Sequence, residues 1–72
     1  YIFSGNGNWS ESTNWSDHLM PPASPGANSQ IIIDPLPGGT CQMNIPYTLS
    51  SGSSLVIQSG KHFIIQGNLI QQ

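Results

Sequence analysis

The sequence carries very little charge. It contains one lysine, no arginine and three acidic residues, so the charged fraction is 6% and the formal net charge is −2. In an average globular domain about a quarter of the residues are charged. Proteins that bind nucleic acids or anionic membrane surfaces use several Lys or Arg side chains to neutralise phosphates. We therefore expect neither a nucleic-acid partner nor binding to a membrane surface.

Long apolar runs and paired cysteines are also missing. No apolar stretch reaches the roughly 20 residues of a membrane-spanning helix, and no basic start followed by an apolar stretch indicates a signal peptide. We expect no membrane insertion and, if the protein is secreted, a mature chain or a fragment. Cys41 is the single cysteine, which excludes a disulfide within the chain. Its alternation with Met43 and Ile45 favours a buried apolar position, with an interchain disulfide or a reactive thiol as alternatives.

The composition favours strands over helices. Nine isoleucines lead the strand-favouring residues, while six prolines and eight glycines interrupt the chain at short intervals. Apolar residues do not recur with helical spacing anywhere. Disordered chains are usually rich in charge and poor in aliphatic residues, which is the opposite of this composition. We predict a folded, all-β protein with almost no helix.

The pattern changes near residue 30. Residues 1–30 start with an apolar run at 1–3, continue with Gly, Asn, Ser and Trp, and end in a Pro-rich turn at 21–26. We predict that they form an N-terminal strand and a capping loop. Residues 31–72 contain short apolar runs between turns, and several runs alternate apolar with polar residues as half-buried strands do. Both parts are predicted to form one compact domain.

The strands predicted in 31–72 repeat once. A shift of 22 to 24 residues places Ile31 on Leu55, Cys41 on Phe63 and Tyr47 on Leu69. Two similar passes of three short strands are typical of a parallel β-helix. We therefore predict a right-handed β-solenoid of about two turns. Its core and assembly positions are predicted to be Ile31, Ile33, Cys41, Met43, Ile45, Leu55, Ile57, Phe63, Ile65 and Leu69.

A small antiparallel β-sandwich is the alternative fold. In it, Ser59-Gly60-Lys61 closes a hairpin between the runs at 55–57 and 63–65. The partner of 55–57 distinguishes the two folds, because the solenoid pairs this run with 31–33 and the hairpin pairs it with 63–65.

Several motifs together carry a resemblance to a known pattern. An aromatic strand and Gly-rich turn lead to a Trp, an Asn-Trp-Ser and prolines, and Gly-spaced strands follow; these motifs are residues 3–10, Asn14-Trp15-Ser16, Pro21-Pro22, 31–33 and 60–69. The chain thus resembles the lead-in and β-helical region of secreted bacterial cell-surface proteins. The resemblance implies an extracellular location and a β-solenoid fold, and it implies no chemistry. Such regions usually continue for more turns than this sequence holds.

Catalysis is not expected from the ionisable residues. An active site needs acids, bases or metal ligands that converge in a pocket. Glu11 and Asp17 are the candidate carboxylate pair, and Asp17 with His18 and Glu11 is the candidate metal site, but the spacing is not typical of either. The sequence contains no nucleophile elbow, phosphate loop or Cys-x-x-Cys. We predict no enzyme, no metal and no cofactor.

Trp9 and Trp15 are the candidate binding residues. Exposed indoles stack on sugar rings, and the neighbouring Asn8, Asn14 and Asp17 offer hydrogen bonds to hydroxyl groups. The alternative is that the indoles cap the end of the β core. Asn8 and Asn14 also begin Asn-Trp-Ser glycosylation sequons.

A two-turn solenoid leaves open backbone edges, which natural proteins blunt with charges or a covering element. Residues 35–72 carry only Lys61 for this purpose, so we expect either that the chain continues past Gln72 or that another copy stacks there. Stacked copies would align amide side chains, namely Gln42, Asn44, Gln58, Gln66, Asn68 and Gln71. The leading hypothesis is a non-catalytic structural module that assembles head to tail into an extracellular fibre or layer. The alternative is a carbohydrate-binding or adhesion module, whose partner is an extracellular or cell-surface glycan.

Overall fold

Short strands dominate the structure, which is a computed structural model and describes residues 1–22 and 26–71. In chain order, the elements are β1 (Ile2–Phe3), β2 (Gly7–Asn8), the 3-10 helices η1 (Ser12–Asn14) and η2 (Ser16–His18), β3 (Gln30–Ile33), β4 (Thr40–Met43), β5 (Tyr47–Leu49), β6 (Ser54–Ile57), β7 (His62–Ile65) and β8 (Leu69–Gln71). No α-helix occurs among the described residues. The all-β prediction is confirmed.

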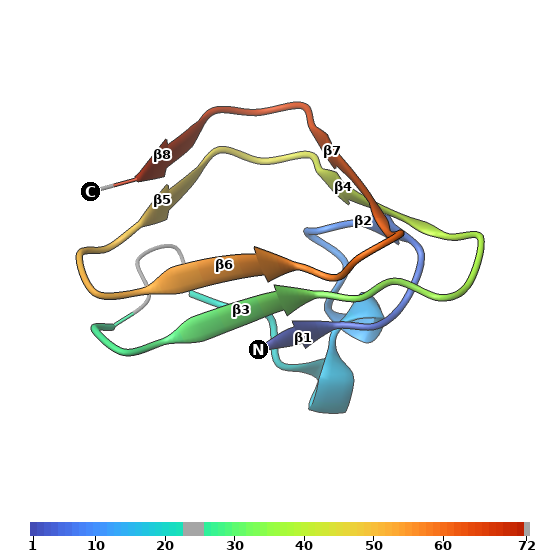
Figure 1. Ribbon diagram of the computed structural model, residues 1–72, viewed down its shortest axis with the longest axis horizontal. Helices are drawn as coiled ribbons and strands as arrows, with labels where there is room; N and C mark the ends of the chain where they lie inside the picture. The colour runs from blue at the N-terminus through green and yellow to red at the C-terminus, as the bar shows by residue number, and fades with distance from the viewer. Residues whose placement is uncertain (23–25, 72) are drawn as a thin grey trace.

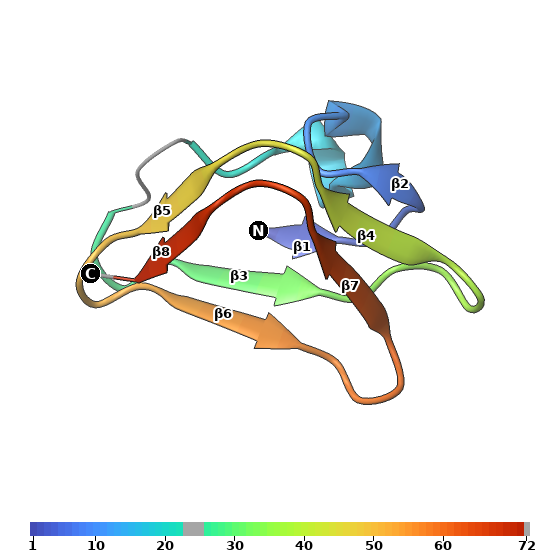
Figure 2. The ribbon, with the colours of Figure 1, turned by 90° about the horizontal axis from the view of Figure 1, so that it is seen from above.

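The strands form three small parallel sheets. Their orders are β1-β3-β6, β2-β4-β7 and β5-β8. Seen from above, the three sheets lie on three sides around a common interior (Figure 2). The chain visits the sheets in turn, so β3, β4 and β5 make one pass and β6, β7 and β8 make the next. We call these the second and third passes, and the first pass contains β1 and β2.

The 22- to 24-residue repeat predicted from the sequence matches the pairing register of these sheets. Ile31 pairs with Leu55, Cys41 with Phe63 and Tyr47 with Leu69, all in parallel strands. The hairpin of the alternative fold is wrong, because the run at 55–57 pairs with 31–33 and not with 63–65. A tight turn does occur at the predicted place, where the Lys61 amide donates to the Gln58 carbonyl at 3.1 Å. This turn redirects the chain into the next sheet instead of reversing it.

The first pass contributes more than the predicted strand and capping loop. β2 was not expected, since Gly7 and Asn8 have no apolar side chains, yet Gly7 pairs with Cys41 and Asn8 with Gln42. A capping segment, residues 9–22, then crosses the end of the molecule below β1 (Figure 1). The Ser4 and Gly5 amides donate to the Asn14 carbonyl at 2.9 and 3.0 Å, and so attach this segment to the outer side of the first pass. Part of the predicted Pro-rich turn, residues 23–25, lies outside the described residues.

The core lies between the three sheets and is aromatic at the capped end. Trp9 is the centre of this cluster, with ring centroids 4.9 Å from Trp15 and 5.0 Å from Tyr47, and Phe3 meets Trp15 edge to face at 5.3 Å. Such pairs stabilise beyond the area that they bury. Among the described residues, the buried side chains that form this core cluster are Phe3, Trp9, Trp15, Ile31, Ile33, Cys41, Met43, Tyr47 and Leu49.

The predicted core positions divide into three groups by burial. Ile31, Ile33, Cys41 and Met43, all in the second pass, are fully buried. Four others are half-buried and pack against that core: Ile45, Leu55, Phe63 and Leu69. Ile57 and Ile65 are not core residues, because 46% and 51% of their surface is exposed. Burial therefore decreases from the capped end of the molecule towards the third pass.

Candidate functional site

The third pass leaves apolar side chains exposed at one end of the molecule. Ile57 pairs in register with Ile33, and Ile65 with Met43, so the members of each pair point to the same face. The second-pass members are fully buried, whereas the third-pass members are about half exposed. The exposure thus arises because nothing among the described residues lies beyond β6 and β7. We call this surface, formed by Leu55, Ile57, Phe63, Ile65 and Leu69, the open end.

The outer backbone edges of two strands at the open end also lack a strand partner among the described residues. β6 and β7 are the last strands of their sheets, and no described strand pairs with their outer edges. Edge strands in monomeric proteins usually carry charged side chains or prolines that prevent further pairing. Within these two strands the only ionisable side chain is His62. The open end therefore combines apolar side chains with unprotected strand edges.

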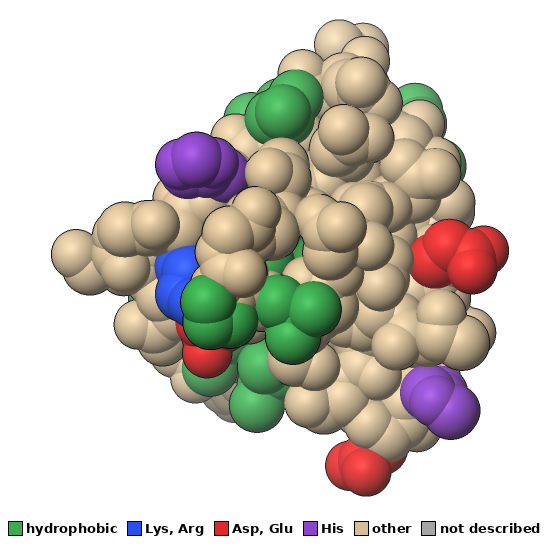
Figure 3. Space-filling view, turned by 90° about the vertical axis from the view of Figure 1, so that its right-hand side faces the viewer, with side chains coloured by type: hydrophobic (Ala, Val, Ile, Leu, Met, Phe, Trp, Pro, Cys, Tyr) green, Lys and Arg blue, Asp and Glu red, His purple; other side chains and the backbone are tan. Residues whose placement is uncertain are grey.

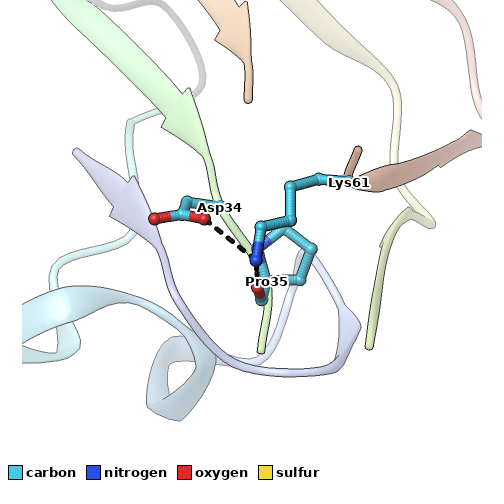
Figure 4. A network of polar contacts seen from close by, with 3 residues as sticks. All are labelled: Asp34, Pro35 and Lys61. Carbon is cyan, nitrogen blue, oxygen red and sulfur yellow. Dashed lines mark hydrogen bonds and ion pairs between the residues drawn. The ribbon is translucent and has the colours of Figure 1, made fainter. Parts of the chain in front are cut away.

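Lys61 lies just before β7 but is held by the second pass. Its Nζ atom lies 3.4 Å from Asp34 Oδ1 and donates a 3.0 Å hydrogen bond to the Pro35 carbonyl (Figure 4). The lysine thus joins two passes at a corner of the molecule. On the face that Figure 3 shows, few side chains are charged, and hydrophobic side chains lie among the others.

Trp9 and Trp15 are buried, with 0% and 1% of their surface exposed. The Trp15 Nε1 group donates a 2.8 Å hydrogen bond to the Trp9 carbonyl, while Trp9 Nε1 has no partner among the described residues. Stacking on a sugar needs an exposed indole face. Neither indole has an exposed face, because both lie in the core beneath the capped end.

The asparagines near these tryptophans hold the capping segment. Asn14 accepts a hydrogen bond from the Asn6 amide through Oδ1 and donates to the Asn8 carbonyl through Nδ2, at 3.2 and 3.0 Å. Asn44 accepts from the Ser10 amide at 3.1 Å and donates to Ser10 Oγ at 2.8 Å. Asn44 was expected among the amide side chains that align between stacked copies, and its contact with the capping segment was not predicted. The Asn8 side chain is exposed.

The candidate metal site at Glu11, Asp17 and His18 is not formed among the described residues. Among the described residues, no three His, Cys, Asp or Glu side chains are close enough together to hold a metal ion. Cys41 is buried, and desolvation raises the pKa of its thiol to about 12. A neutral, inaccessible thiol is neither a good nucleophile nor a ready partner for an interchain disulfide.

A surface cavity lies beside the capping segment. Its volume is about 320 Å³, and its walls are Tyr1, Ile2, Ser16, Asp17 and Leu19, from β1 and η2 and the residues beside them. Asp17 and His18 both have the left-handed backbone conformation, with φ of 58° and 57°. The sequence suggested Asp17 as a hydrogen-bonding residue, but the part played by Tyr1 was not predicted.

Comparisons of this chain with protein-family models, with curated proteins and with solved structures found no match. The resemblance to bacterial surface proteins stays a prediction. A search of the described residues found no helix with the length and apolar character needed to span a bilayer.

Proposed function

We propose that this chain is a non-catalytic structural module of an extracellular bacterial surface protein. It is a short right-handed β-solenoid, capped at one end by residues 9–22, and it associates with other copies through the open end. The observation that carries the proposal is the contrast between buried Ile33 and Met43 and their exposed register partners Ile57 and Ile65. The extracellular location rests on the sequence resemblance alone.

Burial of the open end would stabilise an assembly in two ways. Covering the exposed half of Ile57 and of Ile65 contributes on the order of 1 kcal/mol each. Pairing the outer edges of β6 and β7 satisfies backbone groups that are otherwise left to water. The near absence of charge on these strands means that two copies meet there with little repulsion. A second copy of the chain is therefore a suitable occupant.

The capped end supports a different arrangement from the head-to-tail stacking expected from the sequence. Head-to-tail contact requires a free edge at the first pass, but the Ser4 and Gly5 amides already donate to Asn14. The Asn8 carbonyl likewise accepts from Asn14 Nδ2. The capping segment would have to detach before β1 and β2 could pair with another copy. We propose instead that two copies meet open end to open end, which is an isologous contact and closes as a dimer.

Sedimentation velocity over a range of protein concentrations tests this function. The wild-type chain is expected to form dimers, and a variant with Ile57→Glu and Ile65→Glu is expected to stay monomeric. The matched control carries Val56→Glu and Ile64→Glu, on the same strands but at the alternate positions that face outwards, with 38% and 45% exposure in the wild type. This control should still dimerise.

Each other outcome argues against part of the proposal. A wild-type chain that remains monomeric at all concentrations overturns self-association. Regular filaments in negative-stain electron micrographs would favour head-to-tail stacking over the closed dimer. Loss of association in the Val56→Glu, Ile64→Glu variant alone would place the contact on the outer faces of the sheets.

A further inference from the structure

The cavity beside the capping segment has the chemistry of a small-ligand site. Ligand sites are concave, mostly apolar, and contain a few polar groups that orient the ligand, with volumes from about 300 Å³ upwards. This cavity measures about 320 Å³, with Tyr1, Ile2 and Leu19 as apolar walls and Ser16 and Asp17 as polar ones. The lining thus combines three residues with apolar surface and two that form hydrogen bonds; we call these the apolar side and the polar side.

The apolar side includes an accessible aromatic ring. Tyr1, Ile2 and Leu19 expose 42%, 39% and 59% of their surface, so this wall is open to a ligand. In the folded chain the Tyr1 nitrogen donates to the Gln30 carbonyl at 3.0 Å, which fixes the residue at the edge of its sheet. The Tyr1 ring offers a ligand a large apolar contact area.

The polar side depends on an unusual backbone conformation. Two successive non-glycine residues with positive φ are uncommon, and such strain persists where the surroundings impose it. Here the His18 amide donates to the Trp15 carbonyl at 2.9 Å, and the Leu19 amide donates to the Ser16 carbonyl at 3.1 Å. These bonds hold the left-handed Asp17 at the cavity wall. The Asp17 carboxylate makes no ion pair with any described residue.

We propose that this cavity binds one pyranose residue of a glycan, with the Tyr1 ring against its C–H face and the Asp17 carboxylate accepting hydrogen bonds from its hydroxyls. A pyranose ring has an apolar face and a rim of hydroxyl groups, which corresponds to the two sides of the cavity. Carboxylates form strong hydrogen bonds to donors, and the Ser16 hydroxyl both donates and accepts. A cationic amine could pair with the Asp17 carboxylate, but a small alkylammonium has no ring face to place against Tyr1. This site is separate from the open end and does not depend on the proposed self-association.

Titration of the 15N-labelled protein with methyl pyranosides, followed by NMR, tests this site. At least one of the methyl glycosides of glucose, galactose, mannose and N-acetylglucosamine should shift the amide signals of Ser16, Asp17 and Leu19. Tyr1→Ala and Asp17→Asn should each weaken binding about tenfold, which corresponds to about 1.4 kcal/mol. Asparagine also tolerates positive φ, so Asp17→Asn changes the charge while keeping the backbone preference.

Two control variants separate the site from general effects. Tyr1→Phe keeps the ring, and Glu11→Gln removes an exposed carboxylate outside the cavity, so both should bind like the wild type. The proposal is overturned if no methyl pyranoside shifts these signals, or if butylammonium shifts them and the glycosides do not. It is also overturned if Glu11→Gln weakens binding as much as Asp17→Asn.

Discussion

Ile33 and Ile57 are register partners on neighbouring parallel strands, yet Ile33 is fully buried and Ile57 is 46% exposed. The two residues have the same side chain and lie on the same face of the sheet. They differ in position, because β3 lies between β1 and β6 whereas β6 is the last strand of its sheet. The third pass is therefore a half-covered layer over a complete second pass.

Truncation of these two isoleucines should have unequal effects on stability. Ile33→Ala is expected to lower the free energy of unfolding by about 2–5 kcal/mol, because it leaves a cavity in the core. Ile57→Ala should cost clearly less, since half of the side chain is already in water. Urea unfolding at protein concentrations low enough to prevent association measures both values. Equal losses would mean that Ile57 is buried in the isolated chain.

The two tryptophans of the aromatic cluster should also respond differently to the same substitution. Trp15→Phe removes the donor to the Trp9 carbonyl and leaves that buried acceptor without it, which costs about 1–3 kcal/mol beyond the lost volume. Trp9→Phe removes an indole N–H that has no partner among the described residues, so it loses packing but no hydrogen bond. We expect Trp15→Phe to be the more destabilising variant in thermal unfolding followed by circular dichroism. The reverse order would show that Trp9 Nε1 has a partner in solution.

The sequence contained enough information for the register, but not for the first pass. Alternating apolar residues fix which face of a strand is buried, and a one-residue slip would reverse that face, so matching Ile31 to Leu55 already specified the pairing. β2 has no apolar side chain to signal it, and it forms because its backbone pairs with β4. Short strands of this kind are visible only in three dimensions.

The candidate sites were less predictable because they depend on exposure. Trp9 and Trp15 suit either a sugar platform or a core, and the sequence alone does not say on which side of the sheets they lie. Tyr1 and Asp17 are far apart in sequence and line one cavity only because the capping segment crosses the first pass. Hydrogen bonds such as those of Asn14 decide that crossing, and they have no periodic pattern in the sequence.

Lys61 should contribute more to stability than its ion pair with Asp34 suggests. The pair is 25% and 47% exposed, and exposed pairs are usually worth less than about 1 kcal/mol. Asp34→Asn should therefore change the free energy of unfolding by only a few tenths of a kcal/mol. Lys61→Met also removes the donor to the Pro35 carbonyl and should cost about 1 kcal/mol more. Urea unfolding at low and high salt separates the contribution of the ion pair from that of the hydrogen bond, because salt screens the ion pair more. Identical losses in both variants would contradict a role for Pro35.

Stability should fall at alkaline pH because two buried groups resist ionisation. Desolvation raises the pKa of the Cys41 thiol from 9.0 to about 12. It also raises the pKa of the Tyr47 phenol from 10.0 to about 12, with a smaller contribution from the charge of ionised Tyr1. The unfolded chain loses these protons at lower pH than the folded chain does. The contribution of these two groups to the free energy of unfolding is therefore fully present below pH 9.0. It decreases as the pH rises towards about 12.

Cys41→Ala provides the matched control for this pH dependence. The variant has no thiol to ionise, so its free energy of unfolding should be lower than that of the wild type at neutral pH but should decrease less steeply above pH 9.0. The decrease that remains should begin nearer pH 10.0, where only the Tyr47 phenol differs between the two states. Urea midpoints measured across this range give both slopes. Parallel slopes for variant and wild type would mean that the thiol ionises as readily in the folded chain as in the unfolded one. That outcome would contradict the burial of Cys41 in the second pass.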